Sequence, residues 1–104
     1  MAELITIARP YAKAIFTHAT STKTESAWSA FLQKAALIAV DEATVEMLKN
    51  PAVAASAKCS ILADLTADVT VEGANELMEA LAHYGRLLAL PVISTEFEAL
   101  LAEG

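Results

Sequence analysis

The segment spanning residues 4–20 constrains the fold more than any other part of the sequence. On a helix its polar residues recur at spacings of three and four, so they form one narrow stripe: Thr6, Arg9, Lys13, Thr17 and Thr20. The rest of the circumference is apolar or small, which is more than an ordinary amphipathic helix presents to a core. Two interpretations are open. The helix is buried at the centre of the domain, or it packs inward on one side and contacts a partner on another.

Composition indicates an all-α domain without a nucleic-acid surface. The chain has 104 residues, enough for one domain, with 3 Gly and 3 Pro and no alternating β-branched run. The 13 acidic and 7 basic residues give a net charge of −6, which argues against binding phosphate backbones. Cys59 is the only cysteine, so no intrachain disulfide forms. No charge-free apolar run reaches the roughly 18–20 residues that span a bilayer, so we expect a cytoplasmic protein without direct membrane insertion.

Pro10 leaves the start of the first helix open. Its ring nitrogen cannot donate a hydrogen bond to the carbonyl four residues earlier. Regular helix therefore starts near Ala8 with Pro10 in its first turn, or near Leu4 with a bend at Pro10. A polar segment ends this helix, and Thr22 and Glu25 have the spacing of a capping box for the next one.

Apolar spacing, caps and helix breakers predict five further helices and hence a compact six-helix bundle. The second runs to about Val40, a short third lies between an Asp41 N-cap and the Asn50-Pro51 stop, the fourth covers about 53–65, the fifth covers about 71–84 and the last follows Pro91. Thr70 is the expected N-cap of the fifth helix, and Gly85 its left-handed C′ residue. The fourth helix is expected to turn five residues inward: Ala54, Ala57, Ile61, Leu62 and Leu65.

No group of residues predicts catalysis or a metal site. Glu79 and His83 are four residues apart, whereas the di-iron signature needs a spacing of three and a second copy, so we interpret them as a solvated pair. Cys59 lacks a neighbouring histidine and is expected to behave as a small hydrophobe. Phosphate loops, nucleophile elbows and zinc-ligand spacings are absent from the sequence. The chain is therefore expected to be a binding module rather than an enzyme, with no cofactor.

Four stretches resemble, in the same order, the δ subunit of bacterial F-type ATP synthase, whose mitochondrial homologue is the oligomycin-sensitivity-conferring protein. They are the run Ile7-Ala8-Arg9-Pro10-Tyr11-Ala12-Lys13-Ala14-Ile15-Phe16, then Leu48-Lys49-Asn50-Pro51 with Lys58, then Gly85-Arg86-Leu87 with Leu90-Pro91, then Ile93 and Phe97. The resemblance spans essentially the whole chain. Members of this family carry a second, C-terminal domain, so residues 1–104 are expected to form the N-terminal domain alone.

The resemblance implies a non-catalytic stator component at the top of the catalytic head. There it would bind the N-terminal helix of an α subunit in a groove between the first and fifth helices. The absent C-terminal domain would join the peripheral stalk made by the b subunits. The stalk resists rotor torque, so that rotation drives ATP synthesis. This role implies a cytoplasmic location, peripheral to the inner membrane as part of the complex.

The residue pattern and the resemblance agree on the first helix, because a groove would use its second apolar face. Docking of a helix into a groove relies on apolar anchors at i, i+3 or i+4, and i+7. The predicted groove residues are Ile7, Tyr11, Ala14, Ile15 and His18 from the first helix, with Leu77, Ala80, Leu81 and Tyr84 from the fifth. Core packing is the alternative for each of them, and for His18 a surface or satisfied boundary position. We assign Ile5, Ala12, Phe16 and Trp28 to the core.

Three other functions remain as alternatives. The strongest is a helical-bundle adaptor of an unrelated assembly, which would not bind an α-subunit N-terminal peptide. An enzyme or metal-binding bundle ranks below it, because no suitable cluster of side chains is present. A membrane-surface role is weaker still, since an acidic domain without a basic amphipathic helix is repelled by anionic lipid.

Overall fold

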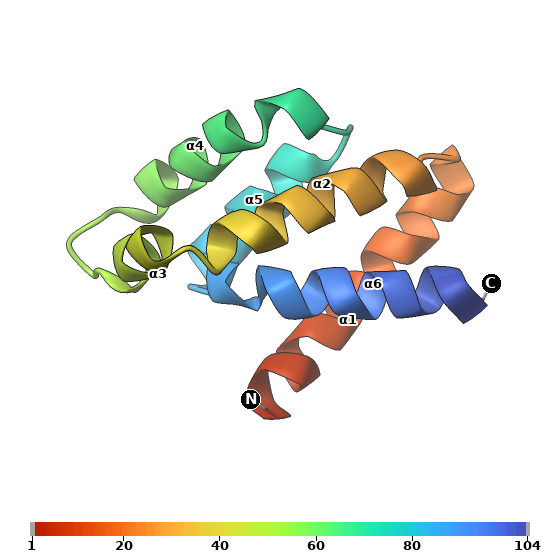
Figure 1. Cartoon of the computed structure of the whole chain (residues 1–104), viewed down its shortest axis with the longest axis horizontal. Helices are drawn as coiled ribbons and strands as arrows, with labels where there is room; N and C mark the ends of the chain where they lie inside the picture. The colour runs from red at the N-terminus through yellow and green to blue at the C-terminus, as the bar shows by residue number, and fades with distance from the viewer. Residues whose placement is uncertain (1, 104) are drawn as a thin grey trace.

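The structure, a computed structural model, describes residues 2–103, with side chains from Leu4 onward. Within this range the chain forms six α-helices and two short 3₁₀ helices, with no strand (Figure 1). They are α1 (Ala2–Thr22), α2 (Glu25–Ala39), α3 (Glu42–Lys49), α4 (Ala55–Leu65), η1 (Ala67–Val69), α5 (Ala74–His83), η2 (Leu87–Ala89) and α6 (Leu90–Glu103). The prediction of an all-α six-helix bundle is confirmed.

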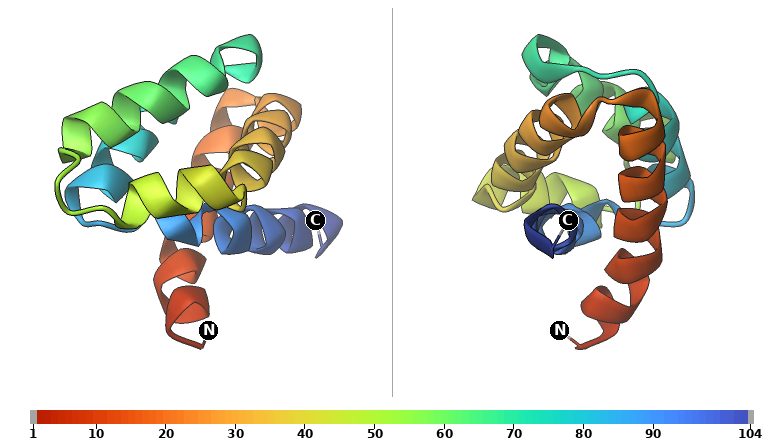
Figure 2. Two further views of the ribbon diagram at one scale, coloured as in Figure 1. Left: turned by 60° about the vertical axis from the view of Figure 1, so that its left-hand side comes forward. Right: turned by 90° about the vertical axis from the view of Figure 1, so that its right-hand side faces the viewer.

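Helix α1 continues through Pro10 rather than starting beside it. Its 21 residues begin at Ala2, which agrees with the alternative of a start near Leu4. The first turns tilt away from the rest of α1 and project beyond the bundle (Figure 2). Ile5 lies on this projecting end and is 37% exposed, so its assignment to the core is wrong. The first turns of α1 extend beyond the other helices, so no other helix of the described chain covers Ile5.

The junction between α1 and α2 differs from the predicted capping box. Lys23 adopts a left-handed conformation (φ 58°), and the N–H of Thr24 donates to the carbonyl of Ala19 at 2.9 Å, as in a Schellman C-cap. Thr22 still belongs to α1, and its hydroxyl donates to the carbonyl of His18 at 2.9 Å. The capping-box prediction is wrong, because α1 extends far enough to use Thr22 in its own last turn. Thr24 is the N-cap of α2 and makes no side-chain capping bond.

Helix α6 is at the centre of the main packing unit. It crosses α1 and runs beside α2 (Figures 1 and 2). The α1 face toward the core consists of Ala8, Ala12, Ile15 and Ala19, and the three alanines are fully buried. Small side chains at these positions allow the neighbouring helix to approach closely. The largest fully buried side chains come from four other helices: Phe31, Leu32, Leu62, Met78, Leu81, Leu90, Ile93 and Phe97.

Aromatic side chains link α1 and α2 to this core. The rings of Phe16 and Phe97 meet edge to face with centroids 6.3 Å apart, and those of Trp28 and Phe31 do so at 5.8 Å. Ala12 and Trp28 are buried, as predicted, and Phe16 is half-buried against the core cluster. The radius of gyration of 12.8 Å is close to the roughly 13 Å of a single domain of this length.

Helix α4 buries a narrower face than the sequence indicated. It packs mainly against α5 (Figure 1), and of the residues predicted to point inward only Leu62 is buried. Ile61 is 40% exposed and Leu65 47%, while Ala54 and Ala57 also face solvent. Their inward assignment is therefore wrong. A single packing partner covers one stripe of a helix, and the remaining apolar residues stay outside it.

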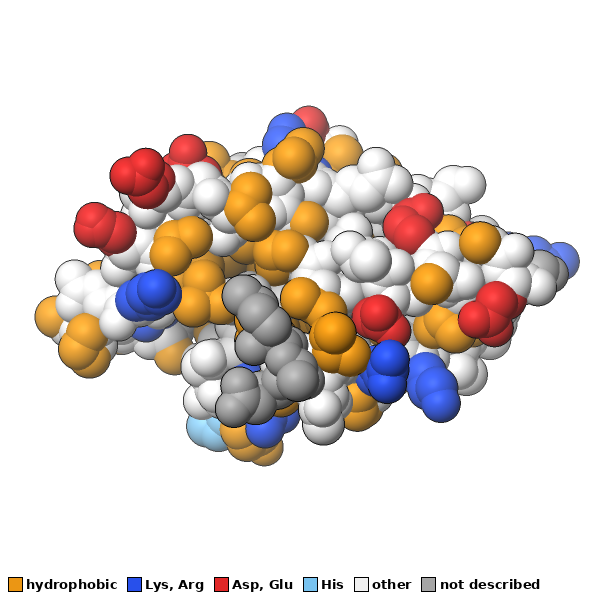
Figure 3. Space-filling model, turned by 60° about the horizontal axis from the view of Figure 1, so that its bottom comes forward, with side chains coloured by type: hydrophobic (Ala, Val, Ile, Leu, Met, Phe, Trp, Pro, Cys, Tyr) orange, Lys and Arg blue, Asp and Glu red, His pale blue; other side chains and the backbone are white. Residues whose placement is uncertain are grey.

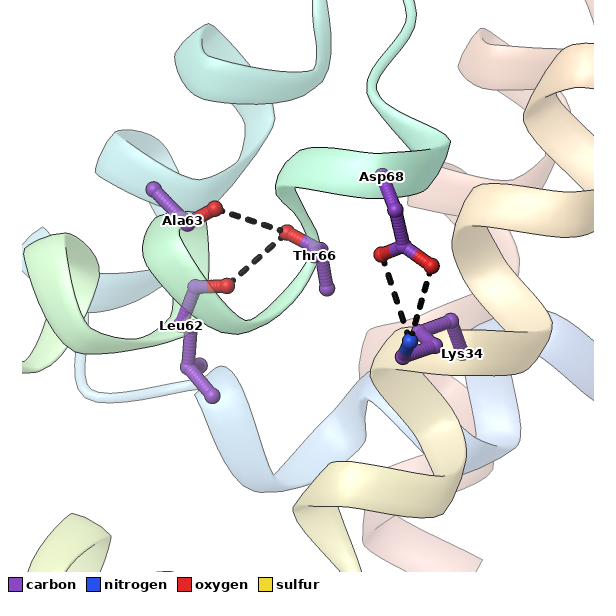
Figure 4. Close-up of polar contacts among 5 residues, drawn as sticks. All are labelled: Lys34, Leu62, Ala63, Thr66 and Asp68. Atoms are coloured by element: carbon purple, nitrogen blue, oxygen red, sulfur yellow. Dashed lines mark hydrogen bonds and ion pairs between the residues drawn. The ribbon is translucent and has the colours of Figure 1, made fainter.

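Polar contacts tie the end of α4 to α2 (Figure 4). The buried hydroxyl of Thr66 donates to the carbonyl of Leu62 at 2.8 Å, which satisfies it within the last turn of α4. In the next turn, η1, Asp68 pairs with Lys34 of α2 at 3.0 Å. These contacts position the loop that leads into α5.

Capping was predicted correctly at α3 and at the end of α5, but not at the start of α5. The carboxylate of Asp41 accepts from the N–H of Thr44, and α3 ends at Lys49 with Asn50 as its C-cap. Gly85 adopts the expected left-handed conformation (φ 66°). The N-cap of α5, however, is Gly73 (φ 99°) instead of Thr70. A Cβ at Gly73 would lie 3.1 Å from Cζ2 of Trp28, so both the backbone conformation and close packing require glycine here.

Exposed apolar side chains are not confined to one region. On the face in Figure 3 they gather near the centre, with most charged side chains toward the edges. Leu37 and Val40, at the end of α2, are 72% and 61% exposed. Apolar exposure is common on protein surfaces, so a site must be identified by its shape and its convergent polar groups. Between residues 2 and 103, no helix combines the length and apolar character that crossing a bilayer requires.

Candidate binding groove between α1 and α5

Two neighbouring depressions follow α1 and share Ala14 in their lining. The first has a volume of about 580 Å³ and is lined by Thr6, Ile7, Pro10, Tyr11, Ala14 and Arg86. The second has a volume of about 210 Å³ and is lined by Ala14, Ile15, His18, Trp28, Gly73 and Leu77. The lining residues belong to α1, to Leu77 of α5 with Gly73 and Arg86 from its two flanking loops, and to Trp28 of α2. We call this feature the α1/α5 groove.

The groove follows a second face of α1, distinct from the face buried in the core. Its residues Ile7, Tyr11, Ala14 and His18 recur at spacings of four, three and four, which is one helical stripe. At a rise of 1.5 Å per residue this stripe is about 17 Å long, or about three turns of helix. Helix α1 is therefore not buried on all sides: one face lies in the core and a second face lines the groove.

The first depression ends at a half-buried arginine. Nη1 of Arg86 donates to the hydroxyl of Tyr11 at 3.2 Å, and its Cζ lies 5.2 Å from the centroid of the Tyr84 ring. The position of Arg86 follows from the end of α5: after the left-handed Gly85, its backbone N–H donates to the carbonyl of Leu81 at 2.7 Å. The end of α5 thus places Arg86 and Tyr84 beside Tyr11 of α1.

The second depression has an aromatic floor. Trp28 is 2% exposed, and its ring meets that of His18 edge to face, with centroids 6.0 Å apart. Gly73 packs closely over the same indole, and half-buried Leu77 forms the adjoining wall. Within the described part of the chain, the indole N–H has no hydrogen-bond partner. This end of the groove is mainly apolar and contrasts with the charged end at Arg86.

The structure brings most of the predicted groove residues together. Six of them line the groove: Ile7, Tyr11, Ala14, Ile15, His18 and Leu77. Tyr84 is 63% exposed and joins the site through Arg86, and Ala80 is half-buried on the same side of α5. Leu81 is fully buried, so it supports the groove from the core and presents no surface to a docked helix. Its inclusion among the contact residues is corrected accordingly.

Five lining residues were not predicted: Thr6, Pro10, Trp28, Gly73 and Arg86. Pro10 had a detectable signal, because it lies three residues after Ile7 and four before Ala14 on the same stripe. Arg86 and Gly73 lie outside the regular helix of α5, where helical periodicity carries no information about side-chain direction. Trp28 was assigned to the core and is buried there, but its ring also forms the groove floor.

A separate depression between α4 and α5 offers no reactive group. Its volume is about 350 Å³, and its lining includes Cys59, Glu79 and His83. Burial, and secondarily the negative charge of Glu79, raise the pKa of the Cys59 thiol above its usual range. The thiolate needed for nucleophilic attack is therefore disfavoured. Among the described residues, no three His, Cys, Asp or Glu side chains are placed to hold a metal ion.

Comparison with known proteins gives the family of the chain. Residues 7–104 match the family model described as ATP synthase delta (OSCP) subunit. The chain is 41% identical over 103 residues to ATP synthase subunit delta of Methylobacillus flagellatus, and 40% identical over 105 residues to that of Alkalilimnicola ehrlichii. Each match covers 99% of this chain and 58% of the relative.

A third relative extends the comparison. ATP synthase subunit delta of a Marinomonas species is 42% identical over 97 residues, which is 93% of this chain and 54% of that protein. The chain thus spans somewhat more than half the length of the relatives that it matches. With a family match over nearly all of its residues and about 40% identity to these relatives, the chain belongs to the ATP synthase delta (OSCP) subunit family.

Proposed function

We propose that this chain is a non-catalytic stator component of F-type ATP synthase, and that the α1/α5 groove binds the N-terminal helix of an α subunit. The observation that carries the proposal is the pair of depressions along α1, which share Ala14 and together span about three helical turns, in a member of this family. A groove of this length accommodates apolar anchors at i, i+3 or i+4, and i+7 of a bound helix.

The lining suits a helix rather than an extended peptide. Extended peptides add to sheet edges, and the described residues contain no strand. At the junction of the two depressions, exposed Ala14 lets a second helix backbone approach closely. Tyr11, Trp28 and Arg86 belong to the three residue types most enriched among energetically dominant interface contacts.

Binding of the catalytic head gives the domain a mechanical role. One surface would hold the α subunit, and the b-subunit stalk would connect through the C-terminal domain that the family carries. Such a link resists the torque of the rotor, so that rotation drives ATP synthesis in the head. The subunit would be attached to the inner membrane, on its cytoplasmic side, through the rest of the complex.

Calorimetric titration tests the proposal. The chain is titrated with a synthetic peptide of the α-subunit N-terminal helix from the same organism, and Trp28 fluorescence is followed in parallel. We expect one-to-one binding with a Kd of about 1 μM or tighter, equivalent to about −8 kcal/mol, and a negative heat-capacity change. A peptide of the same composition in scrambled order serves as the control. Absence of binding by a soluble parent peptide would contradict the proposal and favour an adaptor role in an unrelated assembly.

A further inference from the structure

Arg86 is a half-buried cation without a carboxylate partner among residues 4–103. Arg9 pairs with Glu96 at 3.4 Å, and Lys34 pairs with Asp68 at 3.0 Å. The only side-chain hydrogen bond of Arg86 within residues 4–103 goes to the neutral hydroxyl of Tyr11. Arg86 lies in the wall of the larger depression. Lys58 is also half-buried without a carboxylate partner in the described chain, but it donates to the backbone carbonyl of Leu48 at 2.8 Å and lies outside the groove lining. A charge removed from water without a counter-charge is unfavourable, which suggests that the counter-charge arrives with a partner.

The geometry around Arg86 leaves donors available. A guanidinium has five N–H donors, and Tyr11 accepts from Nη1. Tyr84 contacts the guanidinium through the face of its ring. This cation–π contact leaves the N–H groups of the guanidinium available to other acceptors. The two tyrosines therefore hold the cation in place while further N–H groups remain. A planar guanidinium of this kind matches a carboxylate in a bidentate pair.

We infer that Arg86 binds one Asp or Glu side chain of the helix that occupies the groove, and thereby determines which end of that helix lies over the first depression. The inference rests on the proposed function and adds to it the chemistry of one contact. A docked helix would displace water from Arg86, so a helix without a carboxylate there would leave the cation buried and unpaired. The second depression, with its indole floor and Leu77 wall, is lined by no Lys or Arg side chain. The two ends of the groove thus accept different side chains.

The net charge of the chain strengthens the directional effect. At −6 the domain repels an acidic peptide overall, so an acidic residue is favoured only where a local cation lies within about one Debye length, about 8 Å at physiological salt. Arg86 is the only Lys or Arg among the residues that line the groove. The same carboxylate placed at the other end of the helix would have no partner of this kind.

A double-mutant cycle tests the inference. The α-subunit N-terminal peptide is compared with a series in which each Asp or Glu is replaced, one at a time, by its amide. Each peptide is titrated against the unaltered chain and against Arg86→Gln. We expect Arg86→Gln to weaken binding of the parent peptide about tenfold or more. For one of the amide peptides, the Kd for the unaltered chain should rise by a similar factor. Arg86→Gln should bind that amide peptide about as weakly as it binds the parent peptide.

Arg9→Gln is the matched control, because it removes the same charge from α1 at a position outside the groove lining. Its Kd should equal that of the unaltered chain. If every amide peptide binds the unaltered chain as tightly as the parent, the inference is wrong even where Arg86→Gln binds poorly, since Arg86 would then only brace the two tyrosines. This peptide series needs no altered protein, so it remains decisive if Arg86→Gln does not fold. A parent peptide that does not bind overturns the proposed function itself, and this inference with it.

Discussion

Two faces of α1 both carry alanine and isoleucine but have opposite surroundings. The face formed by Ala8, Ala12, Ile15 and Ala19 is buried in the core. The face formed by Ile7, Tyr11, Ala14 and His18 is half-buried or exposed and lines the α1/α5 groove. Ala12 and Ala14 are two residues apart, about 200° around the helix, and one is fully buried while the other is exposed.

The comparison shows that apolar character alone does not identify a core face. Alanine suits a close helix–helix contact whether the second helix belongs to the same chain or to a partner. The two uses can be separated experimentally: we expect a change on the core face to reduce stability, and we predict that a change on the groove face reduces binding of the proposed partner. Identical substitutions at Ala12 and Ala14 therefore give the clearest test.

Ala12→Asp should have the largest effect. It places an uncompensated carboxylate at a fully buried position, with an expected loss of about 3–5 kcal/mol in the free energy of unfolding. Domains of this size have only about 5–15 kcal/mol in total, so the variant should be largely unfolded or melt at a much lower temperature. Thermal and urea unfolding followed by circular dichroism measures this. A melting transition close to that of the unaltered chain would mean that α6 does not seal this face.

Ala14→Asp should abolish peptide binding and leave the fold intact. The carboxylate would be unpaired in a dry helix–helix contact, which should weaken binding by about 3 kcal/mol, or more than a hundredfold. In the free chain the side chain is exposed, so the loss of stability should stay below about 1 kcal/mol, the difference in helix propensity. Ala30→Asp is the control, since Ala30 is exposed on α2 and lies outside the groove lining. Unchanged calorimetric binding of Ala14→Asp would show that the groove is misplaced.

Tyr11→Ala should have an intermediate effect, mainly on binding. The ring supplies apolar area at the centre of the larger depression, and its loss should weaken binding by about 2 kcal/mol, or about thirtyfold. Tyr11→Phe keeps the ring and removes only the hydroxyl that accepts from Arg86, so it separates the two contributions. Calorimetry and thermal melts are run on the same samples. A large fall in melting temperature with unchanged affinity would contradict this prediction and show that Tyr11 contributes to stability, as a core residue does, and not to binding.

Asp68→Asn should have the smallest effect and gives a reference point away from both faces. A hydrogen bond from Lys34 is the main cause that lowers the pKa of the exposed Asp68 carboxyl below its ordinary value (Figure 4). Because the folded-state pKa is the lower one, the pair contributes stability at neutral pH, and this contribution disappears as the pH falls through the folded pKa. The variant should melt slightly below the unaltered chain at neutral pH and equally at low pH. If the difference in melting temperature between the variant and the unaltered chain persisted at low pH, the charge of Asp68 would not be its cause.

Sequence patterns predicted well wherever the cause was local. The Asp41 cap, the Asn50-Pro51 stop and the left-handed Gly85 each depend on a few neighbouring residues, and each is present in the structure. Most of the groove stripe on α1 was likewise predicted, because i, i+3 and i+4 spacing defines a face. The errors arose where a distant element decides. Ile5 is exposed because nothing covers the end of α1, and Ile61 and Leu65 because α5 covers only one stripe of α4.

By itself, the sequence determined the helical class, the number of helices and the stripe of α1 that lies along the groove. These follow from propensity, capping and periodicity, which act over a few residues. Only the tertiary structure decided which apolar faces are sealed, that Leu81 lies beneath the groove and that Arg86 closes one end of it. Burial depends on which helices meet in space, and the direction of a side chain beyond a helix end depends on how the chain leaves that helix. Neither is encoded in the spacing of residues along one helix.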